Sequence, residues 1–184
     1  MRVETTSLKD CLLIHDTVFT DSRGYFFESF NAQKFFNATG VVVNFVQDNQ
    51  SSSVCGTLRG LHFQYGEHAQ AKLVRVLRGR VLDVAVDMRK DSPTFGKHFS
   101  VELSDESHTQ LFIPRGFAHG FLVLSEKAVF FYKCDNYYNK SAEGGIIYND
   151  ADLNIDWKLP QHELILSEKD KQNPLFKEAI NKIQ

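Results

Sequence analysis

The middle of the chain is a series of short apolar segments separated by turn residues, and this spacing restricts the fold more than any other feature. Residues 99–103 alternate apolar and polar side chains with a period of two, which is typical of a strand with one buried face. Similar apolar runs cover 111–113, 121–124 and 128–132, with turn-forming residues between them. Short strands at this regular spacing predict a β-sandwich or a closed β-barrel.

A further pair of strands is predicted around a glycine. An apolar run at 73–77 leads into Arg78 and Gly79, and valines recur over 81–86. Because glycine readily adopts the conformations of tight turns, this arrangement predicts a β-hairpin that turns at Gly79.

Two short helices are predicted outside the strand-rich region. The first covers residues 32–36, with Asn31 as its N-cap, and ends before Gly40. The second lies near the C-terminus, where Pro174 can occupy the first turn and apolar residues recur at helical spacing over 176–183.

Composition and charge are those of an ordinary globular protein. The 184 residues are 42% hydrophobic and 24% charged, so we expect one domain over residues 1–184 with a sizeable core. The 21 basic and 23 acidic residues give a net charge of −2, which provides no overall attraction to nucleic acid or an anionic membrane. No apolar run approaches the length of about 18 residues that a membrane span requires.

The three cysteines indicate a reducing compartment. Cys11, Cys55 and Cys134 are widely spaced and form no paired motif. We therefore expect neither a disulfide framework nor a zinc site, and the cytoplasm is the compartment that fits best.

Polar residues interrupt a predicted strand near residue 60. A polar run at 47–51 precedes a segment that contains Arg59, His62 and Gln64. Because strand side chains alternate between two faces, His62 and Gln64 share one face, and Arg59 points to the other unless Gly60 marks a bulge. A surface strand whose polar groups are satisfied would show the same pattern.

Two later segments also carry polar rings in apolar surroundings. His119 lies between two glycines, where the backbone can approach a ligand closely. Burying its ring without a partner would cost about 1–3 kcal/mol, so His119 is either hydrogen-bonded structure or function. Tyr132, and then Tyr138 and Glu143, form the third candidate group, although most buried tyrosines are structural.

A divalent metal site is the first alternative to metal-free chemistry. His62, Glu67, His68 and His119 offer nitrogen and oxygen ligands. A metal pair on a strand normally needs two histidines at alternate positions, and here residue 64 is a glutamine, which is a weak neutral ligand. We therefore expect no metal.

A larger set of motifs, read in order along the chain, resembles a known family. The motifs occupy residues 19–28, 47–51, 58–64, 69–76, 87–89, 92–96, 113–121, 132–133, 149–150, 157 and 166–170. Together they resemble the dTDP-4-dehydrorhamnose 3,5-epimerase family of the cupin superfamily. The resemblance implies an all-β, cupin-type jelly-roll barrel with short peripheral helices. One departure is residues 65–67, which stand where a proline-containing loop is expected.

The same resemblance implies the catalytic roles. His62 matches the family's base, Asp170 the carboxylate paired with it, and Tyr132 the acid on the opposite face of the sugar, while Lys72 matches a residue at the keto oxygen. Inverting a carbon beside a ketone requires removing a proton, stabilising the enolate and returning a proton to the other face. Histidine ordinarily titrates near pH ~6.5 and suits the role of base. No metal or other cofactor is then needed.

The resemblance also implies a nucleotide site and a homodimer whose N-terminal strands cross between subunits. The implied nucleotide-binding residues are Arg23, Glu28, Gln47, Asp48, Asn49, Arg59, His119, Tyr138, Glu143 and Lys169. Arg23 and Arg59 suit a diphosphate, because a guanidinium group can donate two parallel hydrogen bonds to phosphate oxygens.

The function expected from this resemblance is cofactor-independent epimerisation at C3 and C5 of dTDP-4-dehydro-6-deoxy-D-glucose, which gives dTDP-4-dehydro-L-rhamnose for dTDP-L-rhamnose biosynthesis. A monofunctional 3- or 5-epimerase of a related nucleotide keto sugar would use much the same residues. A metal-dependent cupin would contain a bound ion. A non-catalytic sugar-nucleotide binder would bind dTDP and exchange no substrate hydrogen.

Overall fold

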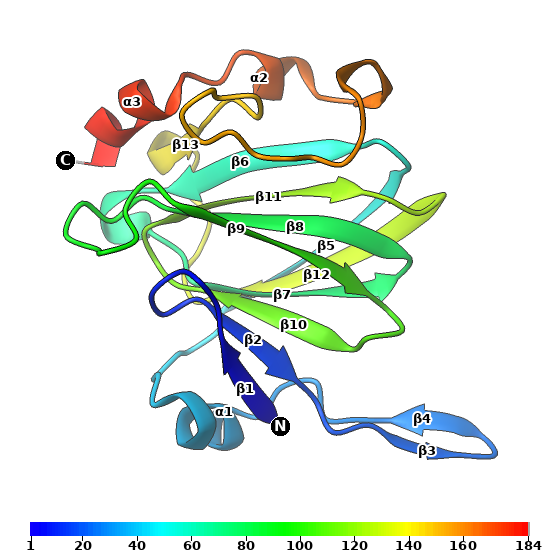
Figure 1. The fold of residues 1–184 in the computed structure, drawn as a ribbon. Coiled ribbons are helices and arrows are strands. Elements are labelled where there is room, and N and C mark those ends of the chain that lie inside the picture. Colours follow the sequence, from blue (N-terminus) through cyan, green and yellow to red (C-terminus); the bar gives the residue numbers. More distant parts are fainter. Residues whose placement is uncertain (184) are drawn as a thin grey trace.

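The backbone forms two antiparallel sheets that face each other, in a computed structural model that describes residues 1–183 (Figure 1). In spatial order, the six-stranded sheet contains β1 (Arg2–Thr5), β2 (Leu12–His15), β10 (Thr109–Ile113), β7 (Lys72–Arg78), β12 (Lys127–Cys134) and β5 (Gln47–Val54). The five-stranded sheet contains β13 (Glu143–Gly145), β6 (Leu58–Gln64), β11 (Phe117–Val123), β8 (Arg80–Asp87) and β9 (His98–Ser104). Successive strands alternate between the two sheets from β5 to β8 and again from β9 to β13, and the predicted all-β jelly roll is confirmed.

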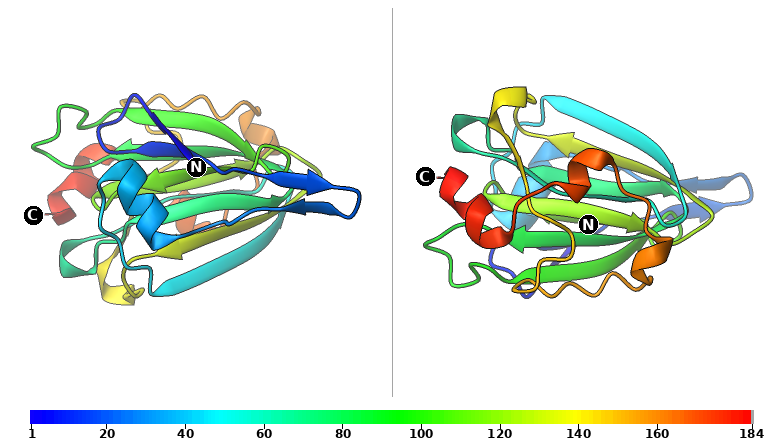
Figure 2. Two further views of the ribbon diagram at one scale, coloured as in Figure 1. Left: turned by 90° about the horizontal axis from the view of Figure 1, so that it is seen from below. Right: turned by 90° about the horizontal axis from the view of Figure 1, so that it is seen from above.

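Short peripheral elements complete the chain. The strands β3 (Phe19–Asp21) and β4 (Gly24–Phe26) pair only with each other and form an arm that extends from the body (Figures 1 and 2). The helical segments are α1 (Ala32–Thr39), η1 (Gly66–His68), η2 (Lys140–Ala142), η3 (Gln161–Glu163), α2 (Glu168–Lys171), α3 (Phe176–Ala179) and η4 (Ile180–Ile183). None of the helices in residues 1–183 has the length and apolar character needed to cross a membrane.

The apolar residues form cores on both faces of the five-stranded sheet. Along β8, Val81 and Ala85 belong to the cluster between the sheets, whereas Leu82 and Val84 belong to a second cluster with Trp157. The C-terminal segment that supplies this second cluster lies over the outer face of the sheet (Figure 1). Strand β8 is therefore buried on both faces, which explains why its sequence is a nearly continuous apolar run.

The hairpin predicted at Gly79 is wrong. Strand β7 pairs with β10 and β12, and β8 pairs with β9 and β11, so the chain changes sheets at this residue. Gly79 has φ of +81°, and a Cβ atom there would lie 2.2 Å from the carbonyl oxygen of Lys127. The glycine is thus required by a sharp corner between sheets, and such a corner has the same local sequence as a hairpin turn.

Both predicted helices form. The Asn31 side chain accepts a hydrogen bond from the backbone N–H of Lys34, and α1 ends at Gly40 with φ of +72°. At the C-terminus, Pro174 precedes α3 and does not occupy its first turn, while Phe176 is buried as expected. Ile183 was predicted to share one side of this helix with Phe176, but its side chain lies outside the part of the chain that the structure describes.

A buried carboxylate fixes the loop between β8 and β9. Asp87 is fully buried and accepts hydrogen bonds from Arg89 Nε at 2.9 Å, Ser92 Oγ at 2.5 Å and Thr94 Oγ1 at 2.6 Å. Arg89 also pairs with Asp10 at 2.8 Å, which ties this loop to the turn before β2. Burial alone would raise the pKa of Asp87, but the hydrogen bonds outweigh burial and lower its pKa to about 2.

We expect Asp87→Asn to lower the free energy of unfolding by on the order of 3 kcal/mol at about pH 7, because Arg89 loses its buried partner. The carboxyl group has a pKa of about 2 when folded against 3.8 ordinarily, so its contribution is present above pH 3.8 and is lost as the pH falls through about 2. Urea unfolding of both proteins checks this. A stability difference that stays unchanged between about pH 7 and about pH 3 would contradict it.

Candidate active site

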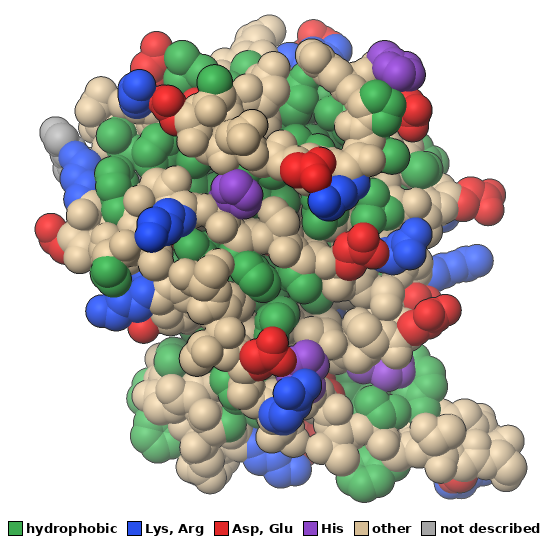
Figure 3. Space-filling view, viewed as in Figure 1, with side chains coloured by type: hydrophobic (Ala, Val, Ile, Leu, Met, Phe, Trp, Pro, Cys, Tyr) green, Lys and Arg blue, Asp and Glu red, His purple; other side chains and the backbone are tan. Residues whose placement is uncertain are grey.

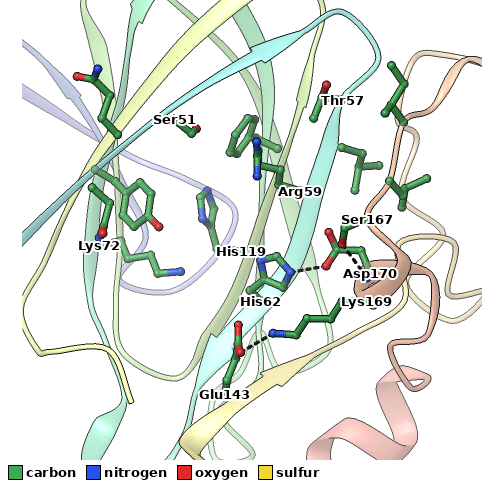
Figure 4. A pocket seen from close by; sticks show the side chains of 17 residues that line it. Ser51, Thr57, Arg59, His62, Lys72, His119, Glu143, Ser167, Lys169 and Asp170 are labelled. Carbon is green, nitrogen blue, oxygen red and sulfur yellow. Dashed lines mark hydrogen bonds and ion pairs between the residues drawn. The ribbon is translucent and has the colours of Figure 1, made fainter. Parts of the chain in front are cut away.

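A cavity of about 600 Å³ is lined by strands of both sheets and by the C-terminal segment (Figure 4). His62 enters it from β6, Lys72 from β7 and Tyr132 from β12, and Asp170 reaches it from α2. All four residues predicted to carry out chemistry therefore line one cavity, although they are far apart in the sequence.

A bulge in β6 brings Arg59 and His62 to the same cavity. Opposite β11, His119 pairs with His62 and Phe121 pairs with Arg59, so β6 has one residue more than its partner over this stretch. The sequence analysis allowed for a bulge at Gly60, and the structure contains it. A Cβ atom at Gly60 would lie 2.5 Å from the Cα atom of the facing strand, so only glycine permits the two backbones to approach this closely.

His62 and Asp170 form a hydrogen-bonded pair. His62 Nε2 lies 2.5 Å from Asp170 Oδ1, and the Asp170 side chain is only 5% exposed. The Ser167 hydroxyl caps α2 by accepting a hydrogen bond from the Asp170 backbone N–H at 3.1 Å, which fixes the position of the carboxylate.

The surroundings of Asp170 keep it ionised. Burial raises its pKa, but the hydrogen bond and charge of His62, together with hydrogen bonds from the Ser167 side chain and the Gly60 backbone, outweigh burial and lower the pKa below its usual value. An ionised carboxylate accepts a proton-bearing Nε2, so Nδ1 is the nitrogen of His62 left to act as a base.

Lys72 lies on the other side of His62 from Asp170 (Figure 4), and Tyr132 lines the same cavity. Lys72 Nζ lies 5.7 Å from the centroid of the Tyr132 ring, and in residues 1–183 it makes no hydrogen bond or ion pair. Burial lowers the pKa of Lys72, whereas burial raises the pKa of Tyr132, which therefore keeps its proton at neutral pH. The cavity thus offers a candidate base, a proton donor and a lysine without an ion-pair partner among residues 1–183.

The rim is held by Glu143. Its carboxylate forms an ion pair with Lys169 and accepts a hydrogen bond from the Tyr138 hydroxyl at 3.0 Å. Burial raises the pKa of Glu143, but these two contacts outweigh burial and lower it. The ion pair joins α2 to β13, so the helix that carries Asp170 is anchored across the edge of the cavity.

The predicted nucleotide-binding residues divide into two groups. Asn49, Arg59, His119, Glu143 and Lys169 line the cavity. The other five do not line the cavity of their own chain: Arg23, Glu28, Gln47, Asp48 and Tyr138.

Strand alternation explains the residues of β5. Asn49 points inward, and Asp48 points outward, where it pairs with Lys133 Nζ at 2.9 Å. Gln47 accepts a hydrogen bond from the Tyr138 backbone N–H at 3.0 Å and donates one to Asn49 at 3.1 Å. Gln47 and Tyr138 therefore do not line the cavity, but each contacts a residue that does: Gln47 contacts Asn49, and Tyr138 contacts Glu143.

Arg23 and Glu28 lie on and beside the arm, away from the cavity. Arg23 is exposed and pairs with Asp21 at 2.6 Å, and Glu28 pairs with Lys34 at 2.7 Å. Neither contact involves a residue that lines the cavity. The structure therefore does not bring these two predicted nucleotide-binding residues to the cavity of their own chain.

Asp83 is a candidate that the sequence analysis missed. It is fully buried on β8, and its two carboxylate oxygens lie 3.1 and 2.9 Å from Nε2 of His119. A signal was present, because Asp83 interrupts the apolar run at 81–86 in the same way that His62 interrupts its own strand. The cavity-lining Ser51 and Ser167 were also within the matched motifs but were given no role.

The donors proposed for a metal site do not converge. His62 and His119 line the cavity, but His68 lies on η1 and accepts a hydrogen bond from Asn139 Nδ2 at 2.8 Å. The Glu67 side chain is 87% exposed. Across the part of the chain that the structure describes, no three His, Cys, Asp or Glu residues are grouped as a metal site would require.

Comparison with known proteins gives a consistent family. The family model described as dTDP-4-dehydrorhamnose 3,5-epimerase matches residues 5–178. The dTDP-4-dehydrorhamnose 3,5-epimerase of Salmonella typhimurium is 52% identical over 183 residues, which cover 98% of this chain and 98% of that protein.

Two solved structures are similar over nearly the whole chain. That of dTDP-4-dehydrorhamnose 3,5-epimerase from Elizabethkingia anophelis has a TM-score of 0.94 and 60% identity, with 97% of each chain covered. That of dTDP-6-deoxy-D-glucose-3,5-epimerase from Legionella pneumophila, in complex with dTDP-4-keto-L-rhamnose, has a TM-score of 0.92 and 46% identity, with 96% of this chain and 93% of that chain covered.

Proposed function

The chain belongs to the dTDP-4-dehydrorhamnose 3,5-epimerase family, and we propose that its cavity inverts C3 and C5 of dTDP-4-dehydro-6-deoxy-D-glucose to give dTDP-4-dehydro-L-rhamnose. This reaction is a step of dTDP-L-rhamnose biosynthesis. The observation that carries the proposal is the arrangement of His62 with Asp170 on one side of the cavity and Tyr132 with Lys72 on the other. The similar Legionella pneumophila structure holds dTDP-4-keto-L-rhamnose.

The proposed chemistry is proton transfer beside a ketone. The hydrogens on C3 and C5 are acidic because the C4 carbonyl can take up the electron pair as an enolate. His62 Nδ1 removes each proton from one face of the ring, and Asp170 stabilises the imidazolium that forms. Tyr132 returns a proton to the opposite face. Exchange with solvent then restores the protonation states of His62 and Tyr132.

Lys72 supplies the electrostatic part of this reaction. Lys72 is partly buried, and within the described residues its ammonium group has no ion-pair partner, so its charge is available to the C4 oxygen as the enolate forms. A fixed charge in a water-poor cavity acts more strongly than it would in water and needs no reorganisation during the reaction. Lys72 is therefore assigned to the transition state and not to nucleotide binding.

We propose a homodimer in which each β3–β4 arm reaches the cavity of the partner subunit. On this arm, Phe19 is 63% exposed, Tyr25 60% and Phe26 70%, and exposed aromatic groups of this size are typical of interfaces. The arm also carries Arg23, whose guanidinium group suits a diphosphate. Glu28 lies just beyond the arm, so the same contact would bring it to the partner.

We also propose that residues 1–184 form one domain that acts in the cytoplasm without binding nucleic acid. Cys11, Cys55 and Cys134 are all free thiols, which is typical of a reducing compartment. The C-terminal segment packs on the five-stranded sheet and shares its core. On the face drawn in Figure 3, basic and acidic side chains are interspersed, with no broad basic patch to attract a polyanion.

Substrate turned over in deuterated water tests the assignment of the base. We expect His62→Ala to slow exchange of the C3 and C5 hydrogens by about a hundredfold or more, because no other group takes the proton from that face. Tyr132→Phe is the matched variant, and it should keep exchange but lose inversion at C5. Both are measured by NMR of the sugar, which also shows whether one carbon or two are inverted. If His62→Ala exchanged the C3 and C5 hydrogens at the wild-type rate, the assignment of His62 as the base would be wrong.

Mixed dimers test the crossing of the arms. His62→Ala and Arg23→Ala are each expected to be poorly active alone. If arms cross, a heterodimer of the two variants contains one intact cavity, so random mixing should restore roughly a quarter of the wild-type rate. If each arm served its own cavity, both cavities would be defective. No recovery after verified subunit exchange would rule out the crossed arrangement.

A further inference from the structure

We propose that Asp83 is the buried countercharge of the cavity, a positioning residue that orients His119 and keeps the Lys72 ammonium charged before substrate binds. Asp83 does not line the cavity, so it acts through these two residues. The inference rests on the proposed role of Lys72, since an uncharged amine at that position would not stabilise an enolate.

The Asp83 carboxylate has few hydrogen-bond partners for a buried anion. It is fully buried on the inner face of β8, and in residues 1–183 its only side-chain partner is Nε2 of His119. An ionised carboxylate can accept about four hydrogen bonds. One N–H donor leaves most of the cost of burial to be offset by a nearby positive charge.

His119 does not supply that positive charge. Burial lowers the pKa of His119, and the charges of Lys72 and His62 lower it further, which outweighs the effect of Asp83. His119 is therefore a neutral imidazole that donates Nε2–H to the carboxylate. The contact fixes the ring and its tautomer but does not neutralise Asp83.

Three acidic groups raise the pKa of Lys72 against the larger effect of burial, and they are Cys134, Asp83 and Glu143. Burial raises the pKa of Cys134 to about 11, so its thiol is neutral near pH 7. Glu143 is already paired with Lys169. Asp83 is therefore the acidic neighbour whose charge no other cation balances.

The remaining groups that face Lys72 do not change this conclusion. From β12, Tyr132 presents its ring, and burial raises the pKa of its hydroxyl, so it carries no charge at neutral pH. From β6, His62 is hydrogen-bonded to Asp170, which balances any charge it carries. Figure 4 shows His119 beside Lys72 and His62 in the cavity.

The direct test is a pH titration of Lys72 in the whole enzyme, followed by NMR of ¹³C-labelled lysine, with Lys72→Arg used to assign the signal. We expect Asp83→Asn to move the midpoint of the Lys72 titration to lower pH by about one unit or more, since the variant removes a negative charge and keeps the shape. The loss of kcat/KM at high pH should move in the same direction. KM for the nucleotide sugar should change little.

Asp87→Asn is the matched control, because it removes a second fully buried carboxylate from β8 that pairs with Arg89 outside the cavity. It should destabilise the protein without moving the Lys72 titration. An unchanged midpoint in Asp83→Asn, or an equal change in both variants, would overturn the proposal. The titration needs no turnover, so its outcome is separate from whether the protein is an epimerase.

A second measurement covers the case in which Asp83→Asn alone does not fold. Lys72→Met leaves Asp83 without its cation, and Asp83→Asn leaves Lys72 without its anion, so each single variant should be destabilised. The double variant has neither unpaired charge, so it should fold even where Asp83→Asn does not, and where all three fold, urea unfolding should show it to be more stable than the sum of the two losses predicts. Additive losses, or a double variant that also fails to fold, would contradict the pairing.

Discussion

The 2.5 Å contact between His62 Nε2 and Asp170 Oδ1 joins two residues that are 108 positions apart, and much of the structure is arranged to make it possible. The bulge at Gly60 aims His62 into the cavity without removing Arg59 from it. The Ser167 cap and the ion pair from the neighbouring residue hold α2 against the rim. The C-terminal segment therefore has two roles: it covers the apolar outer face of the five-stranded sheet, and it places the Asp170 carboxylate beside His62.

The cavity also shows how a jelly-roll core can contain charge. An isolated charge in a protein interior costs several kcal/mol, so buried ionic groups normally occur in pairs. His62 has Asp170 as its partner, and we propose Asp83 as the acidic group that balances the charge of Lys72. The weaker, indirect pairing of Lys72 has a functional consequence, because a cation without a close partner remains able to interact with an oxyanion on the substrate.

Local signals in the sequence were sufficient for some parts of the structure and insufficient for others. Helix α1 was predictable because its N-cap at Asn31 and its terminal glycine are both local features. The corner at Gly79 was not, since a turn within a sheet and a crossover between sheets require the same residue. Strand alternation placed His62 on a face but could not find Asp170, whose position depends on tertiary packing and came only from the family resemblance. Asp83 was overlooked because a single acid in an apolar strand also fits a structural role.

The protonation state of His62 tests the central claim most directly. If Asp170 fixes the imidazole, ¹⁵N NMR of the empty enzyme at a pH where His62 is neutral should show Nε2 protonated and Nδ1 unprotonated, so that Nδ1 is ready to accept a substrate proton. Asp170→Asn should weaken this preference. A neutral His62 that carries its proton on Nδ1 in the wild-type enzyme would contradict the account, because the base would then have no free nitrogen facing the sugar.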